Sequence, residues 1–265
     1  MTYDPFKIDG PTCISFSGGR TSAYMLWRVL QSNQGLPDEA KVLFANTGKE
    51  DEATLEFVNA CEQNWQIKIT WLEYRLDNPN FAIVDFTTAS RTGEPFTQLI
   101  TKRRYLPNPV ARFCTSELKV LTIKRYLNSI NIEDYETMLG IRADEKRRVA
   151  KLRDGNLTPL VAANVSQIDV QKFWHDHKFN LGLDHRDGIT PWGNCDLCFL
   201  KGPNQVLSLI RGKPERATWW AEKEKQIGGT FRSDRPTYAE MAKFAVKQQD
   251  MFDPNEETIA CFCGD

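Results

Sequence analysis

A short apolar run that ends at Ser-Gly-Gly and passes directly into a helical pattern constrains this chain most. Residues 12–16 (TCISF) predict a buried strand, and residues 21–31 carry apolar side chains at helical spacing. Only a tight turn fits between them, within the segment Ser15 to Ser22 (SFSGGRTS). N–H groups at the start of a helix point out of such a turn, so this unit is typical of a phosphate site. Its glycine spacing matches neither GxxxxGK[ST] nor GxGxxG.

Strand and helix patterns continue to alternate along the first third of the chain. Residues 41–45 and 66–74 predict strands, and residues 50–64 predict the helix that connects them. Strands separated by helices form parallel sheets with right-handed crossovers. We therefore predict an α/β fold with a Rossmann-like parallel sheet and helices on both faces.

Helical patterns dominate the rest of the chain. Weak periodicity and several prolines predict a long loop over residues 75–112, before a helix over 116–130 and a strand over 136–141. The patterns that follow are helical. We expect residues 1–160 to form an α/β nucleotide-binding domain. Residues 161–265 are expected to form a mainly helical section with a Cys-rich tail, packed with that domain as one unit.

Composition argues against two classes of protein. The formal net charge is −1, from 34 Lys and Arg against 35 Asp and Glu, so a general coat for nucleic acid is not expected. The longest apolar run has five residues, Ala23 to Trp27, whereas a membrane helix needs about 20. The first residues, MTYDPFKIDG, show no signal-peptide pattern. These features predict a cytoplasmic protein with no membrane partner.

The seven cysteines are odd in number. In a reducing compartment they do not form a disulfide framework. Cys13 and Cys61 lie inside apolar segments and are interpreted as small core residues. The others lie in more polar or glycine-containing segments, where metal ligands and nucleophiles occur: Cys114, Cys195, Cys198, Cys261 and Cys263.

The segment SGGRTS resembles SGGxDS, the pyrophosphate loop of the PP-loop superfamily of adenine nucleotide α-hydrolases. The resemblance implies that ATP or a related adenylate binds at the carboxyl ends of the strands. Thr21 stands where the family has Asp, so the carboxylate that helps to bind Mg²⁺ is missing there, and Mg²⁺ stays open as a companion ion. The nucleotide-binding residues implied in this first part of the chain are Ser17, Gly18, Gly19, Arg20, Thr21, Ser22, Asn46, Thr47 and Gly48.

Three further segments resemble the phosphoadenosine or adenosine phosphosulfate reductase family, and with the loop they span residues 12 to 202. These segments are RFCTSELK at 112–119, GIRADE at 140–145 and CDLC at 195–198. The resemblance implies that Gly140 and Arg142 belong to a basic loop that binds the substrate.

The same resemblance implies a [4Fe-4S] cluster, which family members hold with cysteines. This chain has a single cysteine, Cys114, where the family has a Cys-Cys pair. The ligands implied are Cys114, Cys195, Cys198 and Cys263, with Cys261 as the alternative to Cys263. Structural Zn²⁺ fits the same Cys-x-x-Cys spacing, and redox-active thiols without a metal are a third interpretation.

The tail has a second interpretation within this resemblance. Reductases of the family use a tail cysteine, within Glu-Cys-Gly-[Ile/Leu]-His, as the nucleophile that takes the sulfite group. Only Cys263 and the following glycine are kept here, which argues against simple sulfonucleotide reduction. The candidate catalytic residues are Arg20, Arg142 and Cys263.

The leading hypothesis is a PP-loop enzyme that uses ATP or another adenylate for adenylation and sulfur transfer beside the cluster, with tRNA or DNA as a candidate substrate. Basic residues, among them Lys102 to Arg104, Arg112 and Arg142, would hold phosphates. One alternative is a thiol-dependent reductase of phosphoadenosine phosphosulfate or adenosine phosphosulfate. Another is a non-catalytic nucleotide- or nucleic-acid-binding protein with a structural zinc. A thiol reductant or sulfur-donor protein, and a second copy of the chain, stay open as partners.

Overall fold

The computed structural model describes residues 3–152, 155–185, 190–193 and 195–245. Within these ranges lies a six-stranded sheet in the order β4-β3-β2-β1-β5-β6. Neighbouring strands are parallel except β3 and β4, which are antiparallel. The strands are β1 (Thr12–Ser15), β2 (Ala40–Asn46), β3 (Ile69–Tyr74), β4 (Phe81–Val84), β5 (Glu136–Leu139) and β6 (Asn156–Leu157).

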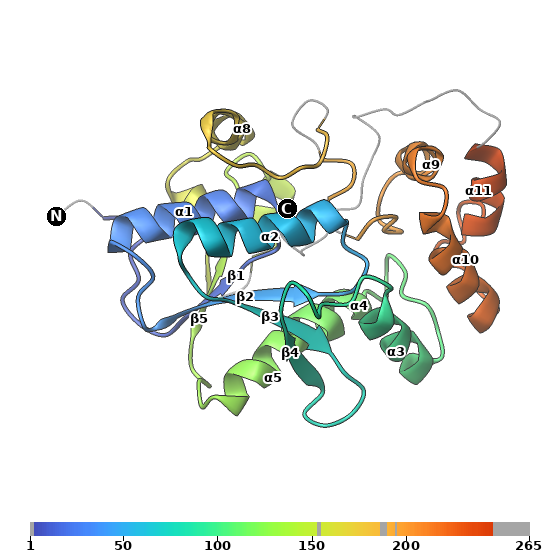
Figure 1. Cartoon of the computed structure of the whole chain (residues 1–265), viewed down its shortest axis with the longest axis horizontal. Helices are drawn as coiled ribbons and strands as arrows, with labels where there is room; N and C mark the ends of the chain where they lie inside the picture. Colours follow the sequence, from blue (N-terminus) through green and yellow to red (C-terminus); the bar gives the residue numbers. More distant parts are fainter. Residues whose placement is uncertain (1–2, 153–154, 186–189, 194, 246–265) are drawn as a thin grey trace.

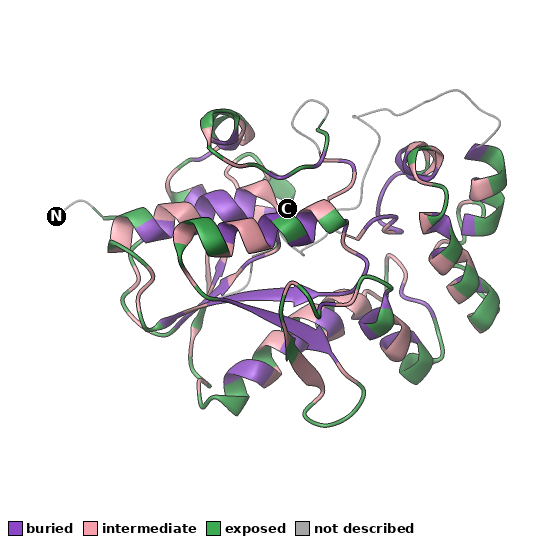
Figure 2. Cartoon of the chain, viewed as in Figure 1, coloured by how far each residue is buried: buried purple, intermediate pink, exposed green. Residues whose placement is uncertain are grey.

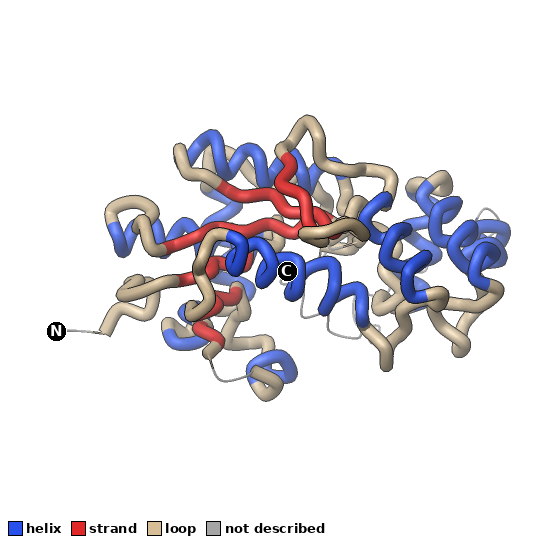
Figure 3. Tube along the Cα trace, turned by 90° about the horizontal axis from the view of Figure 1, so that it is seen from below, coloured by secondary structure: helices blue, strands red, loops and turns tan. Residues whose placement is uncertain are grey.

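Helices cover both faces of this sheet, which confirms the predicted fold class (Figures 1 and 3). α1 (Arg20–Asn33) and α2 (Glu52–Trp65) lie on one face, and α5 (Thr122–Ser129) lies on the other. Alternate residues of a strand point to opposite faces. Ile14 and Phe44 therefore join the core beneath α1 and α2, whereas Cys13 and Leu43 pack with side chains of α5. The central strands are consequently buried on both sides (Figure 2).

The strand order reverses at β1. The chain runs from β1 outward through β2 and β3, and later returns to place β5 on the opposite side of β1. In open α/β sheets, ligands bind outside the carboxyl ends of the strands at such a reversal. The fold therefore points to the loops that follow β1 and β5.

The prediction of a long loop over residues 75–112 is wrong in two places. β4 forms an antiparallel edge strand beside β3, and α3 (Glu94–Arg103) follows it. Phe96, Leu99 and Ile100 are buried at helical spacing, a signal that the neighbouring prolines obscured. Pro95 lies in the first turn of α3, where proline is well tolerated.

The helix expected over residues 116–130 is present but irregular. It starts with α4 (Phe113–Thr115), continues as a π-helix, η1 (Ser116–Leu121), and becomes α5. The hydroxyl of Thr122 donates to the carbonyl of Glu117 at 2.8 Å, five residues back. π-helical turns are rare and occur frequently at functional sites. This one begins two residues after Cys114.

The remaining helices lie after β5. They are α6 (Lys146–Val149), α7 (Pro159–Ala162), α8 (Gln167–Asp176), α9 (Pro203–Gly212), α10 (Arg216–Ile227) and α11 (Tyr238–Ala245). α9, α10 and α11 gather at one end of the molecule (Figure 1). Their apolar faces share a core with α3 and with residues around Phe113 and Leu197. No helix in the described ranges has the length and apolar character needed to cross a bilayer.

Candidate functional site

The loop between β1 and α1 is held in a conformation that requires glycine. Gly18 has a φ of 78°, in the left-handed region that residues with a side chain rarely adopt. A Cβ atom at this position would lie 2.7 Å from Cγ2 of Thr54 and 3.0 Å from Cγ2 of Val58. The loop therefore packs directly on α2, and its path leaves no room for a side chain.

Hydroxyl groups brace this loop from inside. The Oγ atoms of Ser17 and Ser22 are 2.9 Å apart, and the Ser22 hydroxyl also lies 3.0 Å from the carbonyl oxygen of Gly19. Gly19 is the N-cap residue of α1 and supplies no capping side chain. The first N–H groups of α1 thus lack the side-chain acceptor that usually caps a helix, an arrangement suited to an anionic ligand.

The loop after β5 meets the loop after β1 at the sheet reversal. A Cβ atom on Gly140 would lie 2.8 Å from the Cα of Ser22, so the two backbones touch. Two residues later, Nη1 of Arg142 donates to Oγ1 of Thr21 at 3.1 Å. Four predicted nucleotide-binding residues are therefore brought together at the start of α1: Gly140, Arg142, Thr21 and Ser22.

Arg20 points away from this meeting place. Its Nε donates to Oδ1 of Asn180 at 2.8 Å, and Nη1 donates to the hydroxyl of Thr190 at 3.1 Å. Its Nη2 donates to the carbonyls of Leu181 and Leu183 at 2.6 and 3.1 Å. Burial lowers the pKa of this guanidinium. All three of its nitrogens hold the chain after α8, and the phosphate-binding role predicted for Arg20 would require it to leave them.

The residues predicted at the end of β2 shape the loop at the carboxyl end of this strand. Asn46 is fully buried, and its Nδ2 donates to Oε1 of Glu73 at 2.6 Å and to the carbonyl of Ser90 at 2.8 Å. Its Oδ1 accepts from the N–H of Gly48 at 3.0 Å. Asn46 therefore fixes the backbone at Gly48, and its own amide group is already bonded to residues of the protein.

The carboxylate of Glu50 connects the loop after β2 to the segment that contains Cys195. The side chain of Glu50 is 2% exposed, and its Oε2 accepts from the N–H and the hydroxyl of Thr47, both at 2.9 Å. Lys119 of the π-helix lies 3.8 Å from Oε1 of Glu50. Glu50 also forms a β-bridge with Cys195, whose Sγ is 3.5 Å from Oγ1 of Thr47. The predicted nucleotide-binding loop after β2 and the first cysteine of Cys-x-x-Cys are therefore neighbours.

The three described candidate ligands share one environment. Cys114, Cys195 and Cys198 all pack against the second core, which α3 and α9 to α11 also line. Burial, together with the charge of Cys198, raises the pKa of Cys114 to about 12. Burial and then Glu50 raise the pKa of Cys195, to which Cys198 adds and which Lys119 opposes. As free thiols, Cys114 and Cys195 are therefore protonated at neutral pH, and a protonated thiol is a poor nucleophile.

The donor chemistry of these cysteines suits a thiolate-bound metal. Fe–S clusters and structural Zn²⁺ both take several Cys ligands. In the described ranges, however, no group of three or more His, Cys, Asp or Glu side chains is arranged to hold a metal ion. The predicted fourth ligands, Cys263 and Cys261, lie outside the described residues. The residue types fit the group, while its binding geometry stays a prediction.

The basic residues of α3 differ in what they contact. Arg103 pairs with Glu117 of the π-helix, and Arg125 pairs with the same carboxylate at 3.2 Å. Burial alone would raise the pKa of Glu117, but hydrogen bonds from Arg125 and Arg103 outweigh it and the pKa is lowered. Lys102 and Arg104 are exposed. Arg103 thus anchors the π-helix, and the role of Lys102 and Arg104 as phosphate contacts stays a prediction.

Sequence reasoning missed two lysines that hold the Cys-x-x-Cys segment. Lys49 forms a buried ion pair with Asp196, which lies between the two cysteines. The ammonium of Lys201 donates to the carbonyls of Gly193 and Cys195, each at 2.7 Å. An aspartate inside Cys-x-x-Cys was the available signal, since a charge there needs a partner once the segment is buried.

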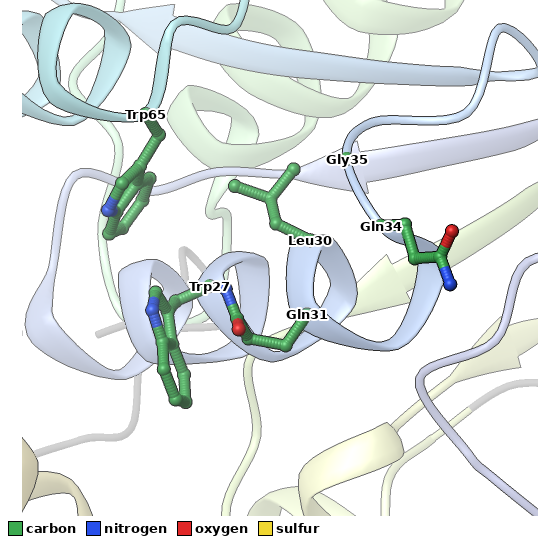
Figure 4. Close-up of a pocket in the computed structure, with 6 residues that line it drawn as sticks. All are labelled: Trp27, Leu30, Gln31, Gln34, Gly35 and Trp65. Carbon is green, nitrogen blue, oxygen red and sulfur yellow. The ribbon is translucent and has the colours of Figure 1, made fainter.

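A separate pocket lies at the far end of α1 from the loop. Figure 4 shows the residues that line it: Trp27, Leu30, Gln31, Gln34, Gly35 and Trp65. It shares no residue with the contacts described above between the loops that follow β1, β2 and β5. We therefore assign the candidate site to the meeting of the β1 and β5 loops and to the cysteines beside β2.

Comparison with known proteins identifies the family. Residues 11–159 match the phosphoadenosine phosphosulfate reductase domain. The match covers more than half of the 265 residues, and the chain belongs to this family of adenine nucleotide α-hydrolase-like proteins. The chain is also similar to an uncharacterized nin region protein of Escherichia phage lambda. The two are 30% identical over 202 residues, which cover 73% of this chain and 67% of the phage protein.

Proposed function

We propose that the chain is an adenine-nucleotide-dependent enzyme that adenylates a substrate and transfers sulfur to it, with a nucleic acid as the candidate substrate. The observation that carries the proposal is the contact between the β1 and β5 loops. Gly140 approaches Ser22 closely, and Arg142 reaches Thr21 at the uncapped start of α1. This arrangement combines helix N–H groups, a guanidinium and a strand reversal, which together favour a nucleotide phosphate.

The chemistry of adenylation fits these groups. A substrate oxygen attacks the α-phosphorus of ATP, the bond to the bridging oxygen breaks, and pyrophosphate leaves with the electron pair. N–H groups of α1 and the guanidinium of Arg142 would stabilise negative charge that develops on the phosphates. A sulfur nucleophile then attacks the activated carbon, a C–S bond forms, the C–O bond breaks, and AMP leaves.

The departure at Thr21 changes how charge is balanced. The family's Asp would bring a negative group beside the phosphates, whereas here the Thr21 hydroxyl accepts from Arg142. The chain therefore places a neutral hydroxyl, bound to the Arg142 guanidinium, where the family pattern has a carboxylate. Any Mg²⁺ would then be carried by the phosphates of ATP, a common mode of Mg²⁺ binding.

We further propose that Cys114, Cys195, Cys198 and Cys263, or Cys261 in its place, hold a [4Fe-4S] cluster. A cluster beside the predicted nucleotide-binding loop after β2 would supply a site at which a sulfur donor binds. The positive charge of Lys119 lies near Cys195 and favours its thiolate form. Structural Zn²⁺ on the same thiolates is the alternative, with the chain then acting as a binding protein.

The test is product analysis with protein purified without oxygen. The enzyme is incubated with α-labelled ATP, sulfide and either unfractionated tRNA or DNA, and AMP and pyrophosphate are measured. We expect formation of both that depends on added nucleic acid and is reduced at least tenfold in Arg142→Met. Sulfite release from phosphoadenosine phosphosulfate with a thiol reductant, without AMP formation from ATP, would instead support the reductase. Nucleotide binding without turnover of either substrate would support the binding protein.

A further inference from the structure

A buried arginine lies behind the loop that carries Arg142. Arg148 is in the short helix α6 and is 6% exposed. A buried guanidinium is costly unless it is paired. Nη1 of Arg148 lies 2.5 Å from Oε1 of Glu145, but its Nε has no hydrogen-bond partner among the described residues. Glu145 is therefore the anion that balances this charge.

The same carboxylate holds the backbone of Arg142. Oε2 of Glu145 accepts from the N–H of Arg142 at 2.8 Å, while Oε1 accepts from Arg148. The N–H of Arg148 also donates to the carbonyl of Glu145 at 2.8 Å. One carboxylate thus connects the buried arginine to the main chain of the residue that we expect to contact phosphate.

The guanidinium of Arg142 contacts Thr21 and Asp144, and its Nη1 also lies 3.8 Å from Oε2 of Glu145. Its Nη1 donates to Thr21, and its Nε donates to Oδ1 of Asp144 at 3.1 Å. The N–H of Ala143 donates to the carbonyl of Val165 at 2.9 Å. Among the described residues, the Glu145 carboxylate is the only hydrogen-bond acceptor for the main-chain N–H of Arg142, and that contact depends on the orientation of the Glu145 side chain.

We propose that Arg148 is a positioning residue that fixes Arg142 against the phosphate-binding loop through Glu145. The proposal rests on the proposed function for its consequence in nucleotide binding. Arg148 acts through Glu145, and none of its contacts described above reaches the phosphate-binding loop between β1 and α1. Its neighbour Arg147 is exposed on the same helix and serves as the matched control.

The first measurement is hydrogen exchange of the full chain without nucleotide. Arg148→Met removes the cation but keeps an apolar side chain of similar length, and Arg148→Lys keeps the charge. We expect exchange at the amides of residues 142–145 to accelerate at least tenfold in Arg148→Met and to recover largely in Arg148→Lys. Arg147→Met should match the wild type. Unchanged exchange in a folded Arg148→Met protein would overturn the proposal.

The second measurement is a double-mutant cycle for ATP binding. We expect Arg142→Met to weaken ATP binding about tenfold and Arg148→Met to weaken it by a smaller factor. Because Arg148 acts through Arg142, the double variant should bind ATP no more weakly than Arg142→Met alone. Losses that multiply would show that Arg148 acts independently, against the proposal. If the wild type binds no ATP, the proposed function fails, and the exchange experiment alone decides the role of Arg148.

Discussion

The ammonium of Lys49 lies 3.2 Å from Oδ2 of Asp196, and the two side chains are only 9% and 5% exposed. Lys49 follows the loop at the end of β2, and Asp196 lies inside Cys-x-x-Cys. The N–H of Asp196 donates to the carbonyl of Lys49 at 2.7 Å, and Nε1 of Trp220 donates to Oδ1 of Asp196 at 2.9 Å. The ion pair of Lys49 and Asp196 therefore connects the loop after β2 to the Cys-x-x-Cys segment and to α10.

Replacing Lys49 should show how much the ion pair with Asp196 contributes to the stability of the fold. Lys49→Met leaves the Asp196 carboxylate buried without its cation, which we expect to cost about 3 kcal/mol of the free energy of unfolding. Denaturant unfolding measures the loss, and exposed Lys68→Met should change it by less than about 0.5 kcal/mol. A second change, Asp196→Asn on the Lys49→Met background, should restore part of the loss. Equal stability of Lys49→Met and Lys68→Met would contradict this role.

A comparison of Gly18 with Gly228 distinguishes two reasons why a position requires glycine: a positive φ, and a lack of space for a Cβ atom. Both have positive φ, 78° and 72°, but a Cβ on Gly228 would meet nothing within 4 Å. Gly228→Ala should therefore show backbone strain alone, about 1 kcal/mol of destabilisation. Gly18→Ala adds the clash with Thr54 and should lose at least about 1 kcal/mol more. Thermal unfolding of both variants checks the difference, and equal losses would show that the loop can move off α2.

The sequence predicted the sheet better than the contacts at its edge. Strand and helix periods and the Ser-Gly-Gly turn depend on local residue order, so β1, α1, β2 and α2 could be read directly. Gly140 and Arg142 were placed by resemblance, and the structure brings both to Thr21 and Ser22. β3 was predicted within residues 66–74, but its antiparallel partner β4 was missed because this four-residue strand lies among residues that favour turns.

Side-chain partners distant in the chain could not be predicted. Arg20 looked like a phosphate contact because it lies inside the loop, but its partners lie 160 and more residues away. Lys49 and Asp196 are 147 positions apart, and nothing local to either residue names the other. Such pairs depend on how the helical section meets the sheet, which no periodicity encodes.

Glu117 predicts a pH dependence of stability. Its pKa in the folded protein is lowered by Arg125 and Arg103, so folding favours its ionised form. Its contribution is therefore fully present above the unfolded pKa of about 4.3 and is lost as pH falls through the lower, folded pKa. Glu117→Gln should be less stable by about 1 kcal/mol at pH 7.

Denaturant unfolding of the wild type and Glu117→Gln between pH 7 and pH 3 measures this difference. It should stay constant down to about pH 5 and shrink at lower pH. A difference that grows as the solution becomes more acidic would contradict the assigned direction of the pKa shift.

Metal analysis tests the cysteine assignment. Protein purified without oxygen should contain about four iron and four sulfide per chain and absorb visible light. Cys198→Ala should lose most of the iron, whereas Cys61→Ala, a change in the fully buried core, should keep it. One zinc and no sulfide per chain would support the structural-zinc alternative, and full iron in Cys198→Ala would remove Cys198 from the ligand set.

The central claim is that the meeting of the β1 and β5 loops binds the phosphates of an adenine nucleotide. Calorimetric titration with ATP tests it most directly. Gly140→Ala places a Cβ 2.8 Å from the Cα of Ser22, whereas a Cβ on Gly229 meets nothing within 4 Å. We predict one ATP per chain for the wild type and Gly229→Ala, and binding at least about tenfold weaker in folded Gly140→Ala. Absence of ATP binding to the wild type, or equal affinity in Gly140→Ala, would contradict the account.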